Sequence, residues 1–408
     1  MESLMSGIDL PRYRSELKEE LNNILTWWMN SAVDPDGGFI GKIDHDQNVY
    51  PESPKGAVLN ARILWSFSAG YNSFGDDKYL EHAHRAYIYI CNHFIDEEYG
   101  GVYWTVDAAG QPLNTRKQVY AISFVIYALA EYSRAAGSTG AEMLAIRLYS
   151  DLEKHSFDSE RTGYFEAFNR DWSEIGDFRL SEKDANEKKT MNTHLHVLEA
   201  YTNLYRNWKD KGLRKQILNL INNFKEHIIR QGNYHLNLFM DEDWTVKSSA
   251  ISFGHDIEAS WLLLEAAEVI EDPQVIQSVK GIAVQVARSS LEGLDKNGGM
   301  FHEFEPDNGH LLREKHWWVQ SEAMIGFFNA WQVSKDERFL HESLRVWDYV
   351  KAYLLDPLHG EWVWGRDESG QVMKTEDKAG MWKCPYHNSR ACFELIKRLR
   401  GFTDFNDL

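Results

Sequence analysis

The sequence predicts an all-α protein with short β-hairpins, built as a single α/α six-fold barrel of six helical hairpins, or twelve helices. A glycine followed closely by an aromatic residue recurs six times at nearly even spacing. Pairs of segments with helical periodicity lie between these recurrences. No linker rich in proline, glycine or serine interrupts the series. We therefore expect one catalytic domain over residues 1–408 instead of a string of domains.

The glycine signal indicates one small β element in each unit. Its first glycines are Gly37, Gly100, Gly163, Gly232, Gly298 and Gly360, which lie 63, 63, 69, 66 and 62 residues apart. Six units of about 68 residues fill the chain. A second turn signal follows at residues 106–111 and 366–371, which predicts short hairpins there.

The helices are expected in pairs, with the first of each pair in an inner ring. Helical periodicity covers residues 58–74 and 79–94, 119–136 and 141–155, 191–208 and 213–229, and 317–333 and 339–354. Turn residues separate helices at 75–77, 137–140 and 271–273. The sixth pair is divided between the ends of the chain, with helices at 10–30 and 387–399.

Composition excludes several classes of protein. The chain is 43% hydrophobic and 26% charged, which is typical of a folded soluble protein. Its net charge of -18 repels phosphate backbones, so we expect no nucleic-acid partner. The start, from Met1 to Gly7, lacks a basic segment before an apolar run, and no stretch approaches a membrane span. We expect a cytoplasmic protein with no membrane partner. Cys91, Cys384 and Cys392 form no C-x-x-C pair, so neither a disulfide scaffold nor a thiolate zinc site is expected.

Polar residues gather where the inner helices are expected to begin. They lie at residues 60–62, 117–120, 192–196, 255–258, 316–322 and 387–390. Three histidines, His196, His255 and His387, occupy matching phases of three units. A structural protein has no evident need for such clusters, so we infer a central pocket lined by histidine, tryptophan, arginine and carboxylate side chains.

Spacing predicts which of these groups act together. His255 and Glu258 are three residues apart on one helix face, so the carboxylate is expected to hold the imidazole in one tautomer. Asn192 and His196 are four apart and also share a face. His194 and His196 are two apart, so at most one of them lines the pocket.

Trp318 and Trp382 leave two interpretations open. Aromatic faces pack against the C–H faces of a pyranose, but most of the 15 tryptophans must serve core packing. A sugar site and ordinary burial are equally compatible with these two residues.

Several strings resemble the N-acylglucosamine 2-epimerase family. They are residues 57–65, 191–200, 252–262 and 382–392, which include the specific Ser-Phe-Gly-His-Asp-Ile-Glu run at 252–258. The resemblance extends from about residue 21 to residue 399 with the motifs in order. The family fold is an α/α six-fold barrel, in agreement with the repeats.

The resemblance implies roles for the clustered residues. His255 and His387 would be the general acid and base, and Glu258 would support His255. Arg62 and His196 would stabilise the oxygen of an enediolate and assist opening of a sugar ring.

Other positions would bind the substrate by the same resemblance. Tyr120 and Asn192 would hold the reacting sugar, and Trp318 and Trp382 would be its stacking platforms. Asp184 matches a binding-loop position.

The implied activity is epimerisation at C2 of the reducing-end sugar of β-1,4-linked disaccharides, with a small-molecule oligosaccharide as substrate. The reaction needs one group that removes a proton and one that returns a proton. Histidine can do either because its reference pKa is about 6.5. No G-x-G-x-x-G run opens a helix, so no nicotinamide is expected; the resemblance implies no cofactor and no metal. A monomer or weak homodimer is expected.

Four competing functions remain. They are an aldose-ketose isomerase or monosaccharide 2-epimerase of the same family, a glycoside hydrolase, a non-catalytic sugar-binding protein and a metal enzyme. The candidate metal ligands are His302, Glu303, Glu305, His310 and His316. Strand alternation places His302 and Glu303 on opposite faces, which disfavours one shared ion.

Overall fold

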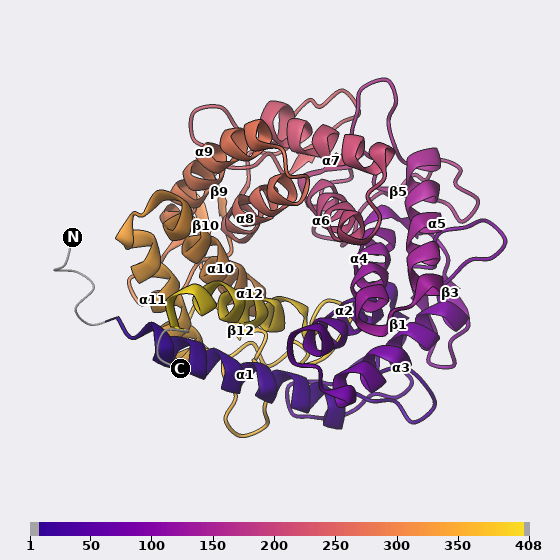
Figure 1. Ribbon diagram of the computed structural model, residues 1–408, viewed down its shortest axis with the longest axis horizontal. Coiled ribbons are helices and arrows are strands. Elements are labelled where there is room, and N and C mark those ends of the chain that lie inside the picture. The colour runs from indigo at the N-terminus through magenta and orange to yellow at the C-terminus, as the bar shows by residue number, and fades with distance from the viewer. Residues whose placement is uncertain (1–7, 404–408) are drawn as a thin grey trace.

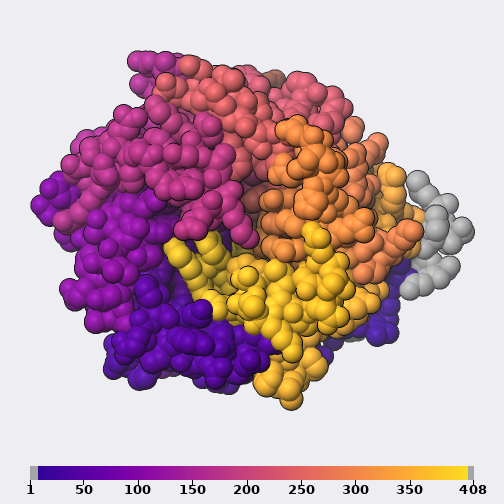
Figure 2. Space-filling view, turned by 180° about the vertical axis from the view of Figure 1, so that it is seen from behind, coloured from indigo at the N-terminus to yellow at the C-terminus, as the bar shows by residue number. Residues whose placement is uncertain are grey.

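The computed structural model describes residues 8–403, which form two concentric rings of helices (Figure 1). The chain passes once around the ring, from indigo to yellow in the figure. Seen from behind, the molecule is hollowed near its centre, where magenta, orange and yellow parts of the chain meet (Figure 2). The segment from Met1 to Gly7, on which the expectation of no targeting segment rests, lies outside the described residues.

The inner ring consists of the first helix of each predicted pair. Its members within residues 8–403 are α2 (Ala57–Phe74), α4 (Val119–Ala136), α6 (Met191–Asn207), α8 (Phe253–Val269), α10 (Trp317–Ser334) and α12 (Tyr386–Thr403). Four of these helices, α2, α4, α8 and α10, are hydrophobic on nearly all sides, and α2 is buried from Ala57 to Gly70. Helices α6 and α12 are more polar, but their first turns are largely buried too. Most polar side chains in the first turns are therefore buried as well.

The outer helices are amphipathic and cover the inner ring. They are α1 (Leu10–Ser31), α3 (Asp77–His93), α5 (Thr139–His155), α7 (Lys211–Asn223), α9 (Pro273–Ser290) and α11 (Glu337–Tyr353). The periodicity predicted one helix over 213–229, but the α-helix ends at Asn223 and a π-helical turn, η1 (Phe224–Ile228), completes the segment. A short 3₁₀ turn, η2 (Leu291–Gly293), follows α9.

The ring closes where α1 packs beside α12, as the divided sixth pair predicted. Buried hydrogen bonds fasten this closure. Trp28 Nε1 donates to Glu361 Oε2 at 2.6 Å, and Trp362 Nε1 donates to Glu20 Oε1 at 2.7 Å. These pairs join residues 333 and 342 positions apart in the chain.

Short strands occupy one end of the barrel. They are β1 (Lys55–Gly56), β2 (Thr105–Val106), β3 (Pro112–Asn114), β4 (Lys117–Gln118), β5 (Ala167–Phe168), β6 (Lys189–Thr190), β7 (Phe239–Met240), β8 (Ile251–Ser252), β9 (Glu303–Glu305), β10 (His310–Leu312), β11 (Lys315–His316) and β12 (Gly365–Arg366). They pair antiparallel as β1-β2-β3, β4-β5, β6-β7, β8-β9-β10 and β11-β12. Each strand before an inner helix thus pairs with the β element that follows the next outer helix, and the first turn of that inner helix is fixed in place.

The repeated glycines serve the turns beside these strands. The first glycine of each signal has a positive φ, from 74° at Gly360 to 127° at Gly37. Residues other than glycine rarely adopt this backbone conformation. The glycine pattern therefore marks six turns of two lengths, because the bridged residues that flank the turn are six apart in the first and fifth units and seven apart in the other four.

A lysine–aspartate ion pair reinforces the same turn in five units of the described chain. The pairs are Lys55–Asp34, Lys117–Asp96, Lys189–Asp158, Lys315–Asp295 and Lys378–Asp356. In the fourth unit Ile251 takes the place of the lysine, and Arg230 donates to the backbone oxygens of Ser249 and Ala250. Most of these pairs are buried, so breaking one would leave an uncompensated charge in the interior.

Glu166 makes stability depend on pH in a defined direction. It is buried and accepts hydrogen bonds from Thr190 Oγ1 at 2.6 Å and Thr193 Oγ1 at 2.8 Å. Burial raises its pKa to about 8. The folded state therefore holds a proton that the unfolded state has released, so stability falls as pH rises from about 4.5 to about 8.

The variant Glu166→Gln should lose much of this dependence because it cannot ionise. Between pH 5 and pH 8.5 we expect the wild type to lose on the order of 1–3 kcal/mol more unfolding free energy than the variant. Urea unfolding at both pH values measures this difference. The exposed Glu81→Gln is the control. Parallel pH curves for wild type and Glu166→Gln would show that Glu166 has an ordinary pKa.

Within residues 8–403, no helix is long and apolar enough to cross a membrane.

Candidate active site

The predicted polar clusters meet inside the barrel, in the first turns of the inner helices. Arg62 lies on α2, His196 on α6, His255 on α8 and His387 on α12. The exposed fractions of the residues Arg62, His196 and His387 are 3%, 2% and 5%. His255 is partly exposed. The charge of His196 acts on His255, and the charges of Arg62 and His196 act on His387, so the structure brings candidates from four units to one region.

Arg390 organises the centre of this region. Its Nη2 donates to Glu258 Oε1 and to Glu322 Oε1, each at 2.6 Å, and its Nη1 contacts Glu199 and the hydroxyl of Tyr386. One guanidinium thus balances three carboxylates that come from α6, α8 and α10.

The three carboxylates differ in proton affinity. Burial opposes ionisation of Glu199, but Arg390 and the hydrogen bond from His196 outweigh it and hold the pKa of Glu199 at about 2. Burial raises the pKa of Glu322. Burial and the neighbouring Glu322 raise the pKa of Glu258 well above its usual value. Glu258 is therefore the carboxyl most disposed to hold a proton.

His387 is oriented by Glu322. Its Nδ1 lies 2.7 Å from Glu322 Oε1, which also serves Arg390, while Trp261 donates to the other oxygen at 3.0 Å. A carboxylate with these donors accepts a hydrogen bond from Nδ1–H, so the neutral imidazole carries its proton on Nδ1 and keeps an unprotonated Nε2. Burial, followed by the charges of Arg62 and Arg390, lowers the pKa of His387 well below 6.5.

His196 has a similar arrangement. Its Nδ1 lies 2.8 Å from Glu199 Oε2, three residues later on the same helix. Burial lowers the pKa of His196, although Glu199 opposes this shift. His194 instead bonds Thr190 O through Nδ1 at 2.6 Å and accepts from the backbone N–H of Tyr164 through Nε2 at 2.9 Å. The two imidazoles therefore have different surroundings, as their two-residue spacing predicts.

His255 differs from the interpretation of its spacing. Its Nδ1 lies 2.8 Å from Ser252 Oγ, and burial lowers its pKa to about 3. Glu258 was expected to hold His255, but its carboxylate pairs with Arg390. The interpretation was wrong in this detail because three-residue spacing permits a contact, whereas the buried guanidinium competes for the same carboxylate.

Arg62 lies among aromatic rings. Its Nη2 donates to the Tyr120 hydroxyl at 2.8 Å, and its guanidinium carbon lies 4.1 Å from the centre of the Phe124 ring. The Nε of Arg62 is buried without a partner in the described protein. Tyr120 packs edge-on against His196 at 5.0 Å and Trp382 at 6.1 Å between ring centres.

Trp318 lies beside two of the candidate histidines. Its ring centre is 4.8 Å from that of His255 and 5.7 Å from that of His387. Trp318 and Trp382 are only half-buried, whereas their neighbour Trp317 is 2% exposed. Each of the two rings therefore keeps some surface that core packing does not use.

The two remaining candidates differ in placement. The side-chain oxygen of Asn192 is buried without a partner among the described residues. Asp184 turns back on its own loop, where Oδ2 accepts from the backbone N–H of Ser181 at 2.9 Å. The described hydrogen bonds do not link Asp184 to the other candidates.

The candidate ligands of a metal do not converge as a set. His310 is exposed and lies 3.8 Å from Glu368, whereas His302 and His316 pack together at 4.2 Å between ring centres. Ligand-type atoms of Glu258, Glu322 and His387 do lie within 4.8 Å of one another. Arg390 already supplies the cation between those carboxylates.

Glu199, Glu322 and Arg390 belong to the site although the sequence predicted no role for them. Glu199 follows His196 by three residues, the same spacing that suggested Glu258 for His255, so this signal was available. Glu322 and Arg390 stood within the polar clusters, but Glu322 lies 65 residues from His387, and Arg390 lies 132 and 191 residues from Glu258 and Glu199. No local spacing predicts such pairings.

Comparison with known proteins identifies the family. The N-acylglucosamine 2-epimerase (GlcNAc 2-epimerase) family matches residues 38–391. A cellobiose 2-epimerase of Bacteroides fragilis is 49% identical over 94% of this chain and 98% of its own. That of Dictyoglomus turgidum is 37% identical over 96% of this chain and all of its own. The structure of cellobiose 2-epimerase from Bacillus thermoamylovorans B4167 is 41% identical, with a TM-score of 0.90 over 95% of this chain and 100% of that chain.

A more distant structure shares the fold alone. A GH76 α-mannanase of Bacteroides thetaiotaomicron is 10% identical, with a TM-score of 0.62 over 99% of both chains. The barrel therefore does not by itself distinguish an epimerase from a glycosidase. The family match and the cellobiose 2-epimerases confirm the expected enzyme class, a carbohydrate epimerase among the isomerases. The chain belongs to the N-acylglucosamine 2-epimerase family.

Proposed function

We propose that this protein interconverts the glucose and mannose configurations at C2 of the reducing-end sugar of β-1,4-linked disaccharides. Cellobiose would become glucosyl-mannose, and lactose would become epilactose. The reaction proceeds by ring opening, removal of the C2 proton by one histidine to give an enediolate intermediate, and return of a proton to the opposite face of C2 by the other. The names of the similar enzymes support cellobiose as a substrate.

One arrangement carries this proposal. His255 and His387, from α8 and α12, both lie against the half-buried ring of Trp318, at 4.8 Å and 5.7 Å between ring centres. A sugar stacked on that ring would be within reach of two imidazoles from different helices. Removal of a proton from one face of C2 and its return to the other face needs such a pair.

The remaining groups stabilise the intermediate. The enediolate carries negative charge on the former carbonyl oxygen, and Arg62 supplies a permanent cation with an unpartnered Nε–H. His196 presents an unprotonated Nε2, because Nδ1–H is held by Glu199, and accepts the proton of the anomeric hydroxyl during ring opening. The free oxygen of Asn192 and the ring of Trp382 bind the sugar.

The proton balance requires one neutral and one protonated imidazole. The neutral imidazole takes the proton from C2, and the protonated one returns a proton to the opposite face. Burial lowers the pKa of both imidazoles in the free protein. The developing negative charge of the enediolate favours the protonated form, and Glu322 adds to this effect at His387.

The proposal extends to the whole chain. Residues 1–408 form one catalytic domain, the protein acts as a monomer or weak homodimer, and catalysis needs neither cofactor nor metal. Asp184 belongs to the loop that meets the second sugar.

Proton NMR with cellobiose in D₂O tests this function. Without added cofactor or metal, and after treatment with EDTA, we expect new mannose-type anomeric signals and deuterium at C2 of the product. Free glucose would instead indicate a hydrolase, and a ketose as the sole product would indicate an isomerase. Absence of any change with cellobiose, lactose, mannose and N-acetylglucosamine would refute the proposal.

A further inference from the structure

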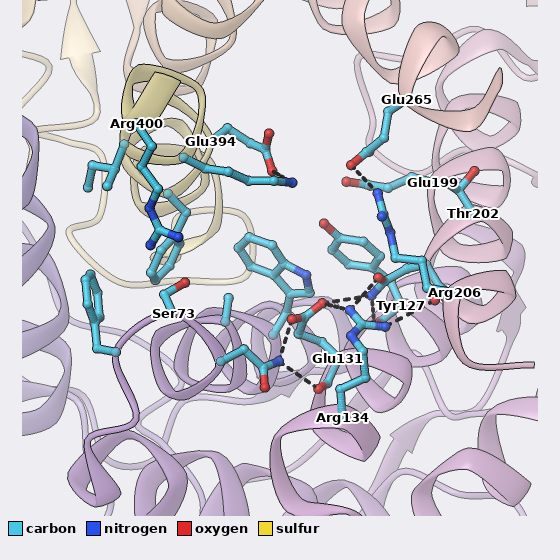
Figure 3. A pocket seen from close by; sticks show the side chains of 18 residues that line it. Ser73, Tyr127, Glu131, Arg134, Glu199, Thr202, Arg206, Glu265, Glu394 and Arg400 are labelled. Atoms are coloured by element: carbon cyan, nitrogen blue, oxygen red, sulfur yellow. Dashed lines mark hydrogen bonds and ion pairs between the residues drawn. The ribbon is translucent and has the colours of Figure 1, made fainter. Parts of the chain in front are cut away.

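A second cavity lies in the same barrel, further along the inner helices. Its volume is about 370 Å³, and it is lined by residues of α2, α4, α6, α8 and α12 (Figure 3). The candidate catalytic residues occupy the first turns of these helices, whereas the cavity extends to Phe74 and Arg206 near the ends of α2 and α6. Glu199, Arg206 and Glu265 lie on one side of it in the figure, and Glu394 and Arg400 lie on the other.

Two polar groups of the cavity wall have no partner. Trp65 and Thr202 are 7% and 2% exposed, and Trp65 Nε1 and Thr202 Oγ1 are buried without a hydrogen bond in the described protein. Buried polar groups are nearly always paired, so this N–H donor and this hydroxyl leave two hydrogen bonds for water or a ligand in the cavity to supply. Neither group contributes to the proposed epimerisation.

The wall chemistry selects a neutral ligand. Four carboxylates and four basic side chains line the cavity, so it has no net formal charge. Much of this charge is neutralised internally, since Arg206 pairs with Glu265 at 2.7 Å and Arg134 pairs with Glu131. A phosphate or a free cation therefore finds no excess of the opposite charge.

An aromatic surface completes this chemistry. The ring of Trp65 stacks on that of Tyr127 at 5.3 Å between centres and 11° between planes. The two rings are 7% and 8% exposed and contribute apolar atoms to the cavity wall. Apolar atoms together with dense donors and acceptors suit a molecule that has both C–H groups and hydroxyl groups, which is the chemistry of a sugar.

The cavity and the catalytic site share one residue. Glu199 lines the cavity, yet its carboxylate also accepts from His196 Nδ1 at 2.8 Å and contacts Tyr386 and Arg390. A hydroxyl that donates to Glu199 from the cavity would compete with the N–H of His196. Occupancy of the cavity would thus weaken the bond that orients a catalytic imidazole.

We propose that this second cavity binds a neutral mono- or disaccharide and that its occupancy slows turnover at the other end of the barrel through Glu199. The binding of a sugar in this cavity does not depend on the proposed epimerase function, whereas the effect on turnover rests on it. The ligand would act as an inhibitor that does not compete with the substrate.

Binding can be tested without measuring activity. Methyl β-D-glucopyranoside is a suitable probe because its blocked anomeric carbon prevents reaction. In protein labelled with ¹⁵N-tryptophan, the indole signal of Trp65 is the one that disappears in Trp65→Phe. We expect this signal to shift saturably with the probe, and Thr202→Val to weaken that binding at least five-fold. The exposed Thr139→Val is the matched control.

Each other outcome counts against the proposal. An unmoved Trp65 signal, a titration that Thr202→Val leaves unchanged, or a shift caused by inorganic phosphate but not by the glycoside would refute the sugar site. Turnover is then measured at saturating cellobiose, where we expect the probe to lower kcat in the wild type and not in Thr202→Val. Saturable binding with unchanged kcat would refute the coupling alone, and an inactive enzyme with intact binding would count against the epimerase function only.

Discussion

Replacing His387 by asparagine should lower kcat on cellobiose by about 10²- to 10⁴-fold, the usual contribution of a general acid or base. Asparagine can still donate a hydrogen bond to Glu322, so Arg390 and its carboxylates keep their partners. The same loss is expected for His255→Asn. Initial rates by NMR or by chromatography of the disaccharides measure both effects, and the exposed His359→Asn should retain wild-type turnover.

A second readout separates catalysis from a structural role. If each histidine serves one face of C2, a variant that lacks one base can still exchange the proton on the other face. We therefore expect one of the two variants to incorporate deuterium at C2 of unreacted cellobiose in D₂O without forming glucosyl-mannose. Wild-type kcat in both variants, or equal loss of exchange and epimerisation with a lowered melting temperature, would contradict the assignment.

Replacing Arg390 by methionine should destabilise the fold by about 3–5 kcal/mol, the usual cost of removing one partner from a buried ion pair. The change leaves Glu199, Glu258 and Glu322 in the interior without their shared cation. Urea unfolding at pH 7 measures the loss. As a control, Arg147→Met removes an exposed pair with Glu97 and should cost less than about 1 kcal/mol.

A double variant tests the reason for this loss. Arg390→Met combined with Glu199→Gln should recover part of the stability, because Glu199 is the carboxyl whose pKa Arg390 helps to hold at about 2 and which therefore carries a buried charge. If Arg390→Met alone costs no more than Arg147→Met, the carboxylates are not held as charged groups by the guanidinium.

The repeats predicted much of this fold because a turn with a positive-φ glycine recurs after the outer helix of each unit. These glycines mark the units, and the expected helix over 119–136 has the bounds of α4. Local periodicity did not predict the π-helical turn at the end of α7, because that turn retains the same sequence pattern as an α-helix.

The site was predictable as a location but not as a network. Helix phase placed Arg62, His196 and His387 in one region. Helix phase did not predict that Glu322 would bond to His387 or that Arg390 would form an ion pair with Glu258. These contacts depend on the rotation of each inner helix about its axis, which is set by packing against both neighbours and leaves no trace in local spacing.

The closure between α1 and α12 has a consequence for the nascent chain. Glu20 on α1 can accept its hydrogen bond only after Trp362 has been synthesised, 342 residues later. At about 5–20 residues per second, synthesis takes roughly 17–70 s to supply that partner. During this interval the apolar face of α1, which includes Leu17, Leu21 and Ile24, has not met its final neighbours. Of the described helices, α1 is thus the earliest made and among the last to be covered, so chaperones that shield apolar helices should engage this segment.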